Sequence, residues 1–311
     1  MISVISRVRP LALIALCCAL LAGCGVGPGK AGAAALVGQA RIPVNEVQSR
    51  YRSVLEKEPE AKAQLTEQGQ LGELGRRIAG DLVRRELIEQ AARDEDLRVD
   101  ERRVGQVIDA AGGPEAASAG QIYTESDLAD VVRSRLLAAE LGRGYVDRLA
   151  ITYDVSSATT RGEAEEKARR MARGDQESAA VVTADQQAGL GAAADQRLRS
   201  AEVPDLAAGT PLFGALPGTA MAFQLQPQSG QWTVVRIKRR DVGAPPPAPS
   251  SAGADEMRMQ AFGDQLLRVT AQRAGVELSP RYGVWDQLAM SAAPNQDETV
   301  GFVFPETGSR S

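Results

Sequence analysis

The chain has 311 residues, a formal net charge of −4, three cysteines and no histidine. The absence of histidine removes the commonest general base and the commonest transition-metal ligand, and the acidic balance argues against a nucleic-acid-binding protein. We therefore expect no metal site, no cofactor and no nucleic-acid partner. A hydrophobic fraction of 43% is sufficient for one or two globular cores.

The first 24 residues have the pattern of an export signal. Two arginines precede an apolar run over 11–21, which is too short to span a bilayer but suits the apolar region of a signal peptide. The motif LAGC at 21–24 then resembles the lipobox of bacterial lipoproteins. This resemblance implies cleavage between Gly23 and Cys24 and a diacylglyceryl group on the Cys24 sulfur. The alternative is an ordinary secretory signal with a chance cysteine.

A lipid on Cys24 would fix the location of the mature chain. Because two acyl chains give stable anchoring, we expect the protein on the extracytoplasmic face of the cell membrane. Cys17 and Cys18 leave with the signal peptide (1–23), so no disulfide or free thiol is expected. The glycine-rich segment 24–33 is typical of a flexible tether.

The segment 34–150 is predicted to be a helical domain. It opens with a short strand or hairpin over 34–42 that turns at Gly38. Apolar residues at helical spacing then predict four amphipathic helices, which run from Val44 to about Glu58, from Leu71 to about Ala92, from Val104 to Ala111, and from Thr124 toward Leu149. Thr124 and Asp127 resemble a capping box, and the motif GGP at 112–114 is expected to stop the third helix.

Charges of both signs are mixed along these helices, as is typical of solvated faces with i,i+4 pairing. A carboxylate pair for acid–base work or a metal site is the alternative. With no histidine and no distinctive spacing, we assign no catalytic residue. The arginines between Leu71 and Asp109 are Arg76, Arg77, Arg84, Arg85, Arg93, Arg98, Arg102 and Arg103.

The segment 151–242 is predicted to be a small α+β module. Its expected elements are a strand over 151–155, a helix over 161–173, a short strand at Val181 and Val182, and a strand over 232–238. A proline-rich spacer follows over 243–254 and is expected to be extended.

The segment 255–290 is predicted to return to the helical domain. It contains a helix that ends at Gly275 and then a short strand with two aromatic residues over 276–285. Because an isolated strand needs a hydrogen-bonding partner, we expect 276–285 to pack against 36–55. The tail 291–311 is predicted to be disordered, with Phe302 to Phe304 docked loosely.

This order of segments resembles the SurA/PrsA group of extracytoplasmic chaperones. The resemblance rests on the opening VGQARIPVNEV at 37–47, the four helices, the small module and the closing motif SPRYGVWD at 279–286. It implies a mainly α, multidomain fold. A helical chaperone domain is built from both chain ends, and a parvulin-type prolyl isomerase module is inserted. A helical lipoprotein unrelated to this group is the alternative.

The module also resembles parvulins in three motifs, DQQAGLG at 185–191, PLFGALPG at 211–218 and SGQWTVVRI at 229–237. The two histidines of the parvulin site fall near Thr152 or Tyr153 and on Trp232. Since an indole cannot rebuild their hydrogen-bond network, we expect a degenerate module, with Trp232 and Phe213 in the core.

The resulting hypothesis is a lipid-anchored chaperone that binds unfolded or nascent exported proteins in an apolar groove of the helical domain, without catalysis. Deleting the module is then expected to leave binding intact. Two alternatives stay open. One is a prolyl isomerase with a histidine-free site, and the other is a non-catalytic scaffold for assembly of an envelope complex.

Overall fold

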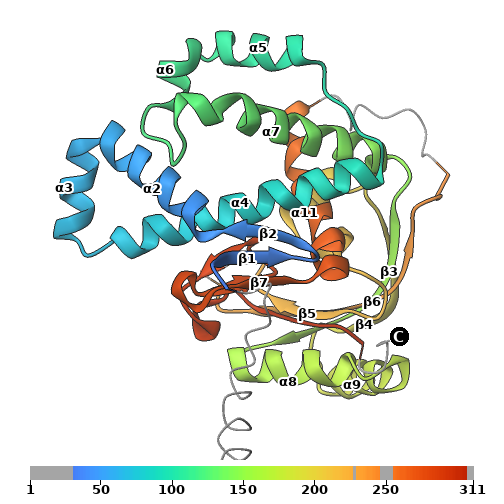
Figure 1. Cartoon of the computed structure of the whole chain (residues 1–311). Helices are drawn as coiled ribbons and strands as arrows, with labels where there is room; N and C mark the ends of the chain where they lie inside the picture. Colours follow the sequence, from blue (N-terminus) through green and yellow to red (C-terminus); the bar gives the residue numbers. More distant parts are fainter. Residues whose placement is uncertain (1–30, 227–228, 246–254, 307–311) are drawn as a thin grey trace, which may run out of the picture.

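The computed structural model describes residues 31–226, 229–245 and 255–306. The chain is mainly helical and forms a helical body and a smaller α+β module (Figure 1), as predicted. The helices of the body are α2 (Val44–Lys57), α3 (Pro59–Glu67), α4 (Leu71–Asp94), α5 (Glu101–Ala110), α6 (Gly113–Ser118), α7 (Glu125–Val146) and α11 (Glu256–Ala274).

Local sequence signals account for the long helices of the body. α7 begins at the predicted capping box, where the Thr124 backbone N–H donates to the Asp127 carboxylate at 2.9 Å. α11 ends at Gly275, whose φ of 76° suits glycine. The four predicted helices are confirmed. The short helices α3 and α6 were not predicted, and each has a proline in its first turn, Pro59 and Pro114. Pro114 therefore opens a helix where the sequence predicted only a stop.

A three-stranded sheet joins the two ends of the chain. β1 (Ala33–Val37) and β2 (Ala40–Pro43) form the predicted hairpin, which turns at Gly38. On its other side β1 pairs with β7 (Val276–Leu278), antiparallel, with Val37 opposite Val276. The predicted return of the C-terminal segment is confirmed, and the helical body is built from both ends of the chain.

α11 lies against α7 with the two backbones in close contact. Gly142 on α7 faces the Met259 carbonyl, and Gly263 on α11 faces the Ala138 carbonyl. A Cβ atom built on Gly263 would lie 1.8 Å from the Ala138 carbonyl oxygen. The contact therefore depends on the absence of side chains at these two positions.

The module is an antiparallel sheet covered on one face by helices α8 and α9 (Figure 1). Its strand order is β10-β5-β6-β3-β4, where β10 is the strand Phe302–Phe304. Its elements are β3 (Ala150–Ala158), α8 (Arg161–Met171), α9 (Asp175–Gln187), β4 (Ala193–Arg199), α10 (Pro204–Gly209), η1 (Leu212–Gly214), β5 (Ala220–Phe223) and β6 (Trp232–Asp241).

The strand predicted at Val181 and Val182 is wrong, because both residues lie in α9. They are buried together with Ser178 and Asp185, so the buried positions follow helical spacing. Packing against the sheet therefore overrides the β-preference of two adjacent valines.

The tail is also different from its prediction, because 291–306 is built into the fold. β9 (Ser291–Ala293) pairs with β8 (Val284–Asp286), and β10 (Phe302–Phe304) is an edge strand next to β5. Arg236, which is 3% exposed, pairs with Glu306 at 2.8 Å. A buried guanidinium that gains a carboxylate partner holds the end of this segment in place.

The module and the helical body share one hydrophobic core. The cluster includes Ile78 and Leu87 from the body and Val235 and Ile237 from the module. Phe213 of the module packs edge-to-face on Phe262 of α11, with ring centroids 6.1 Å apart. The module is therefore not packed as a separate domain, and its deletion would expose the part of α11 that Phe213 contacts. The prediction that deletion leaves binding intact assumed a separately packed module.

The predicted signal peptide, its predicted cleavage site at Gly23 and Cys24, and part of the proline-rich spacer (246–254) lie outside the described residues. Among the described residues, no helix is both long enough and apolar enough to cross a membrane. Within the same ranges, no group of acidic residues is arranged to hold a metal ion.

Candidate functional site

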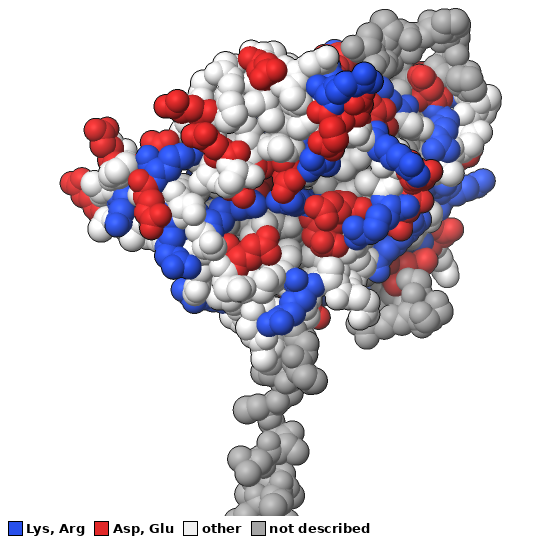
Figure 2. Space-filling model, turned by 45° about the horizontal axis from the view of Figure 1, so that its top comes forward, with Lys and Arg blue, Asp and Glu red and all other residues white. Residues whose placement is uncertain are grey.

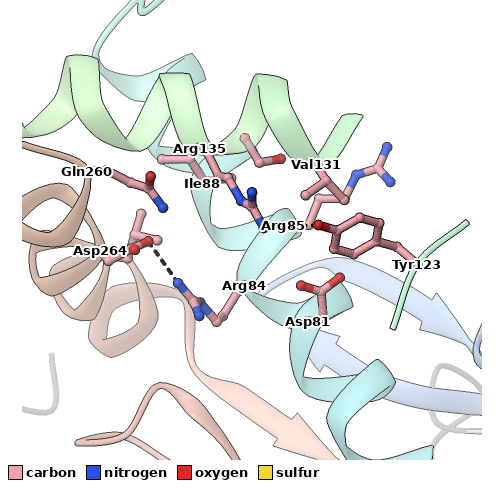
Figure 3. A pocket seen from close by; sticks show the side chains of 11 residues that line it. Asp81, Arg84, Arg85, Ile88, Tyr123, Val131, Arg135, Gln260 and Asp264 are labelled. Carbon is pink, nitrogen blue, oxygen red and sulfur yellow. Dashed lines mark hydrogen bonds and ion pairs between the residues drawn. The ribbon is translucent and has the colours of Figure 1, made fainter. Parts of the chain in front are cut away.

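Two of the hollows in the described part of the chain are lined by the helical body alone. The first, which we call the arginine pocket, has a volume of about 310 Å³ and lies between α4, α7 and α11 (Figure 3). Its lining residues are Asp81, Arg84, Arg85, Ile88, Tyr123, Val131, Ser134, Arg135, Gln260, Asp264 and Leu267.

Most of the charges of the arginine pocket are paired between helices. Arg84 on α4 pairs with Asp264 on α11 at 2.9 Å (Figure 3). Asp81 pairs with Arg50 on α2 at 3.0 Å, and Arg85 pairs with Asp130 on α7 and with Glu89. These pairs tie α4 to the helices around it.

Neighbouring charges keep the Arg85 pair ionised. Burial by itself would lower the pKa of Arg85, but the carboxylates of Asp130 and Glu89 outweigh it and raise that pKa above its ordinary value. Burial likewise tends to raise the pKa of Asp130, and the guanidinium groups of Arg85 and Arg133 lower it below its ordinary value. Both groups are therefore charged at neutral pH.

Arg135 is the exception in the arginine pocket. It donates to the Tyr123 hydroxyl at 3.3 Å, and its guanidinium lies 5.9 Å from the centre of the Tyr123 ring. In the described part of the chain it has no carboxylate partner. The Gln260 amide also lacks a hydrogen-bond partner among the described residues. Ile88, Val131 and Leu267 give the same pocket an apolar lining.

The second hollow, the α2–α4 groove, has a volume of about 230 Å³ and an apolar lining. Its apolar lining residues are Val54, Leu55, Ala61, Leu65, Leu74 and Ile122, and its other lining residues are Glu58, Gln64, Gln68, Arg77, Gly120 and Gln121. Lys57 fixes the loop that carries Ile122, since its ammonium donates to the carbonyl oxygens of Ser118 at 2.6 Å and Tyr123 at 2.9 Å. The groove has the character that the sequence analysis expected of a client-binding surface.

The parvulin positions of the module do not form one site. Trp232 lies opposite Ala158 at one end of β3, whereas Tyr153 lies opposite Ile237. The five residue steps from Tyr153 to Ala158 correspond to roughly 17 Å of strand. Tyr153 packs toward the core shared with the body, and Trp232 packs under α8 and α9. The two positions are therefore on opposite faces of the sheet.

The other landmark residues of the module are structural. Phe213 is fully buried and Trp232 is 7% exposed, which agrees with the expectation that both belong to the core. Asp185 accepts from the Ser156 hydroxyl and pairs with the Lys167 ammonium at 2.9 Å. Burial tends to lower the pKa of Lys167, but Glu163 and Asp185 raise it above its ordinary value.

A further buried pair beside this cluster has no counterpart in the sequence motifs. The Ser178 hydroxyl donates to the Asp154 carboxylate at 2.6 Å, and the Asp195 backbone N–H donates to the same carboxylate at 2.9 Å. No local spacing pairs Asp154 with Ser178, so the sequence could not indicate this contact. These groups use their hydrogen-bonding capacity on one another rather than on a substrate.

Comparison with known proteins finds a family model that matches the N-terminal part of the chain. Residues 5–137 match the family model of the SurA-like N-terminal domain. The chain carries a SurA-like N-terminal domain. The resemblance to the SurA/PrsA group of chaperones is thereby confirmed.

The match contains the whole α2–α4 groove and the α4 and α7 side of the arginine pocket. A crystal structure of the foldase protein PrsA from Lactococcus lactis aligns over 79% of this chain and 94% of its own, with 12% identity and a TM-score of 0.29. That score is too low to establish a shared fold. No protein with a curated description matches the chain.

Proposed function

We propose that this protein is a lipid-anchored chaperone that binds unfolded or nascent exported proteins on the extracytoplasmic face of the cell membrane. The observation that carries the proposal is that the apolar α2–α4 groove lies wholly within the SurA-like domain. Apolar side chains gathered in an open groove are suited to apolar side chains of an extended chain. The lipobox at Cys24 supports the location.

The groove is tested by suppression of aggregation. Residues 25–311 should reduce the light scattering of a denatured, reduced lysozyme client at near-stoichiometric ratio. Leu65→Glu introduces a charge into the groove on α3, a helix without fully buried residues, so the variant should fold. We expect that about ten times more of this variant is needed for equal suppression of aggregation. The reason is that burial of one leucine side chain contributes about 1.5–3 kcal/mol to the free energy of binding.

Leu225→Glu is the matched control, because Leu225 is 54% exposed and lies outside the groove. It should suppress aggregation as the unchanged protein does. Equal loss in both variants would show that the groove is not the binding surface. Rapid cis–trans exchange of a Xaa-Pro peptide would instead favour the isomerase, and the absence of both activities would favour the assembly scaffold.

The anchor is tested separately at Cys24. Cys24→Ala removes the sulfur that would receive the lipid, so the variant should remain unprocessed or leave the membrane fraction on fractionation. Cys17→Ala, within the apolar run, should be processed and retained normally. Membrane retention of a Cys24→Ala chain with correctly cleaved N-terminus would contradict the lipid anchor.

A further inference from the structure

The arginine pocket holds one cation that the fold itself does not neutralise. Arg84, Arg85 and the buried Arg50 all have carboxylate partners within the body. Among the described residues, the guanidinium of Arg135 contacts only the Tyr123 hydroxyl and ring, and the side chain is exposed. It is therefore available to a ligand, and the Tyr123 contact limits the directions in which it can point.

The surroundings of Arg135 combine two kinds of contact. Ile88, Val131 and Leu267 provide apolar surface. The Gln260 amide, which has no hydrogen-bond partner among the described residues, provides a second polar group (Figure 3). The volume of the arginine pocket, about 310 Å³, is at the lower end of the roughly 300–1,000 Å³ found for ligand sites. Figure 2 shows acidic and basic side chains interspersed over the face that it draws, so specificity on this face has to come from such local geometry.

We propose that the arginine pocket binds a carboxylate adjacent to an apolar side chain on an extended client segment, with Arg135 as its anchor. This inference rests on the proposed function, which makes polypeptides the ligand class. Arginine presents two parallel N–H donors to a carboxylate, a geometry that lysine and neutral side chains do not offer. The aspartates of the pocket do not compete, because Asp81 and Asp264 are paired with Arg50 and Arg84.

The carboxylate can belong to an acidic side chain or to the C-terminus of the client. Three N-terminally labelled octapeptides of leucine and alanine separate these sources by fluorescence anisotropy. The first has one central glutamate and an amidated end, the second has glutamine and an amidated end, and the third has glutamine and a free end. We expect the first or the third to bind residues 25–311 about tenfold more tightly than the second, as for one charge-assisted hydrogen bond.

Arg135→Gln removes the charge and should abolish this preference, while binding of the neutral peptide stays the same. Arg102→Gln is the matched control, since Arg102 lies on α5, is 88% exposed and pairs with Asp100 outside the pocket. The control should retain the tenfold preference. Melting temperatures of both variants verify folding, because Arg135→Gln also removes the contact of Arg135 with the buried Tyr123.

Equal affinity for all three peptides, or an equal loss for all of them in Arg135→Gln, would overturn the inference. Neither result would affect aggregation suppression through the α2–α4 groove. Conversely, an Arg135-dependent carboxylate preference without aggregation suppression would support the pocket and refute the chaperone function.

Discussion

A chain that ends at Val242 should lose the cooperative thermal unfolding of its helical body, although it retains every residue of α2 to α7. The cut removes α11, whose Met259, Phe262, Leu266 and Leu267 are each no more than 3% exposed. At about 1.5–3 kcal/mol for each buried side chain, the loss is comparable with the whole stability of a domain, about 5–15 kcal/mol.

The same cut removes β7 and leaves β1 with an open edge. Circular dichroism at 222 nm during heating measures the outcome, and a chain that ends at Glu306 is the control because it keeps every described element. Adding residues 255–306 as a separate polypeptide should restore part of the transition. An unchanged melting curve for the chain ended at Val242 would contradict the return packing.

The features that were predicted correctly from the sequence are those determined by local patterns. α4 and α7 each repeat apolar residues at helical spacing, and the capping box at Thr124 lies within four residues of sequence. The pairing of β7 with β1 was also predicted, because a strand without neighbours in the sequence has to find a partner elsewhere.

The predictions that were wrong concern segments whose structure depends on contacts with distant parts of the chain. Val181 and Val182 belong to a helix because they complete a buried face with Ser178 and Asp185, which only the sheet beneath defines. β10 forms as a strand because it pairs with β5. The sequence of β5, Ala-Met-Ala-Phe, contains no β-branched residue that would identify it as a strand. Without β5, Phe302 to Phe304 had no recognisable edge to join.

The candidate site was predictable in outline but not in detail. Mixed charges on the helices indicated ion pairs, and Arg85 with Glu89 is one at i,i+4 spacing. The pairs Arg84–Asp264 and Arg50–Asp81 join distant segments, so the sequence could not show which carboxylates were already paired. For that reason it could not single out Arg135 as the arginine without a carboxylate.

The second large effect is expected from one methyl group at the contact of α7 and α11. In Gly263→Ala the new Cβ would lie 1.8 Å from the Ala138 carbonyl oxygen, and Gly142→Ala would place one 2.1 Å from the Met259 carbonyl oxygen. Both neighbours are backbone atoms of helices, which cannot move aside alone. The helices must separate, and the packing of Phe262 and Leu266 is lost with them.

We expect Gly263→Ala to lower the free energy of unfolding by about 3 kcal/mol, at the upper end for overpacked cores. Gly144→Ala lies two residues beyond Gly142 in α7 and has no atom within 4 Å of the new Cβ. It should raise stability by up to about 1 kcal/mol, because alanine favours helix more than glycine. Urea denaturation of both variants measures the difference, and a shift of both midpoints in the same direction would disprove the close contact.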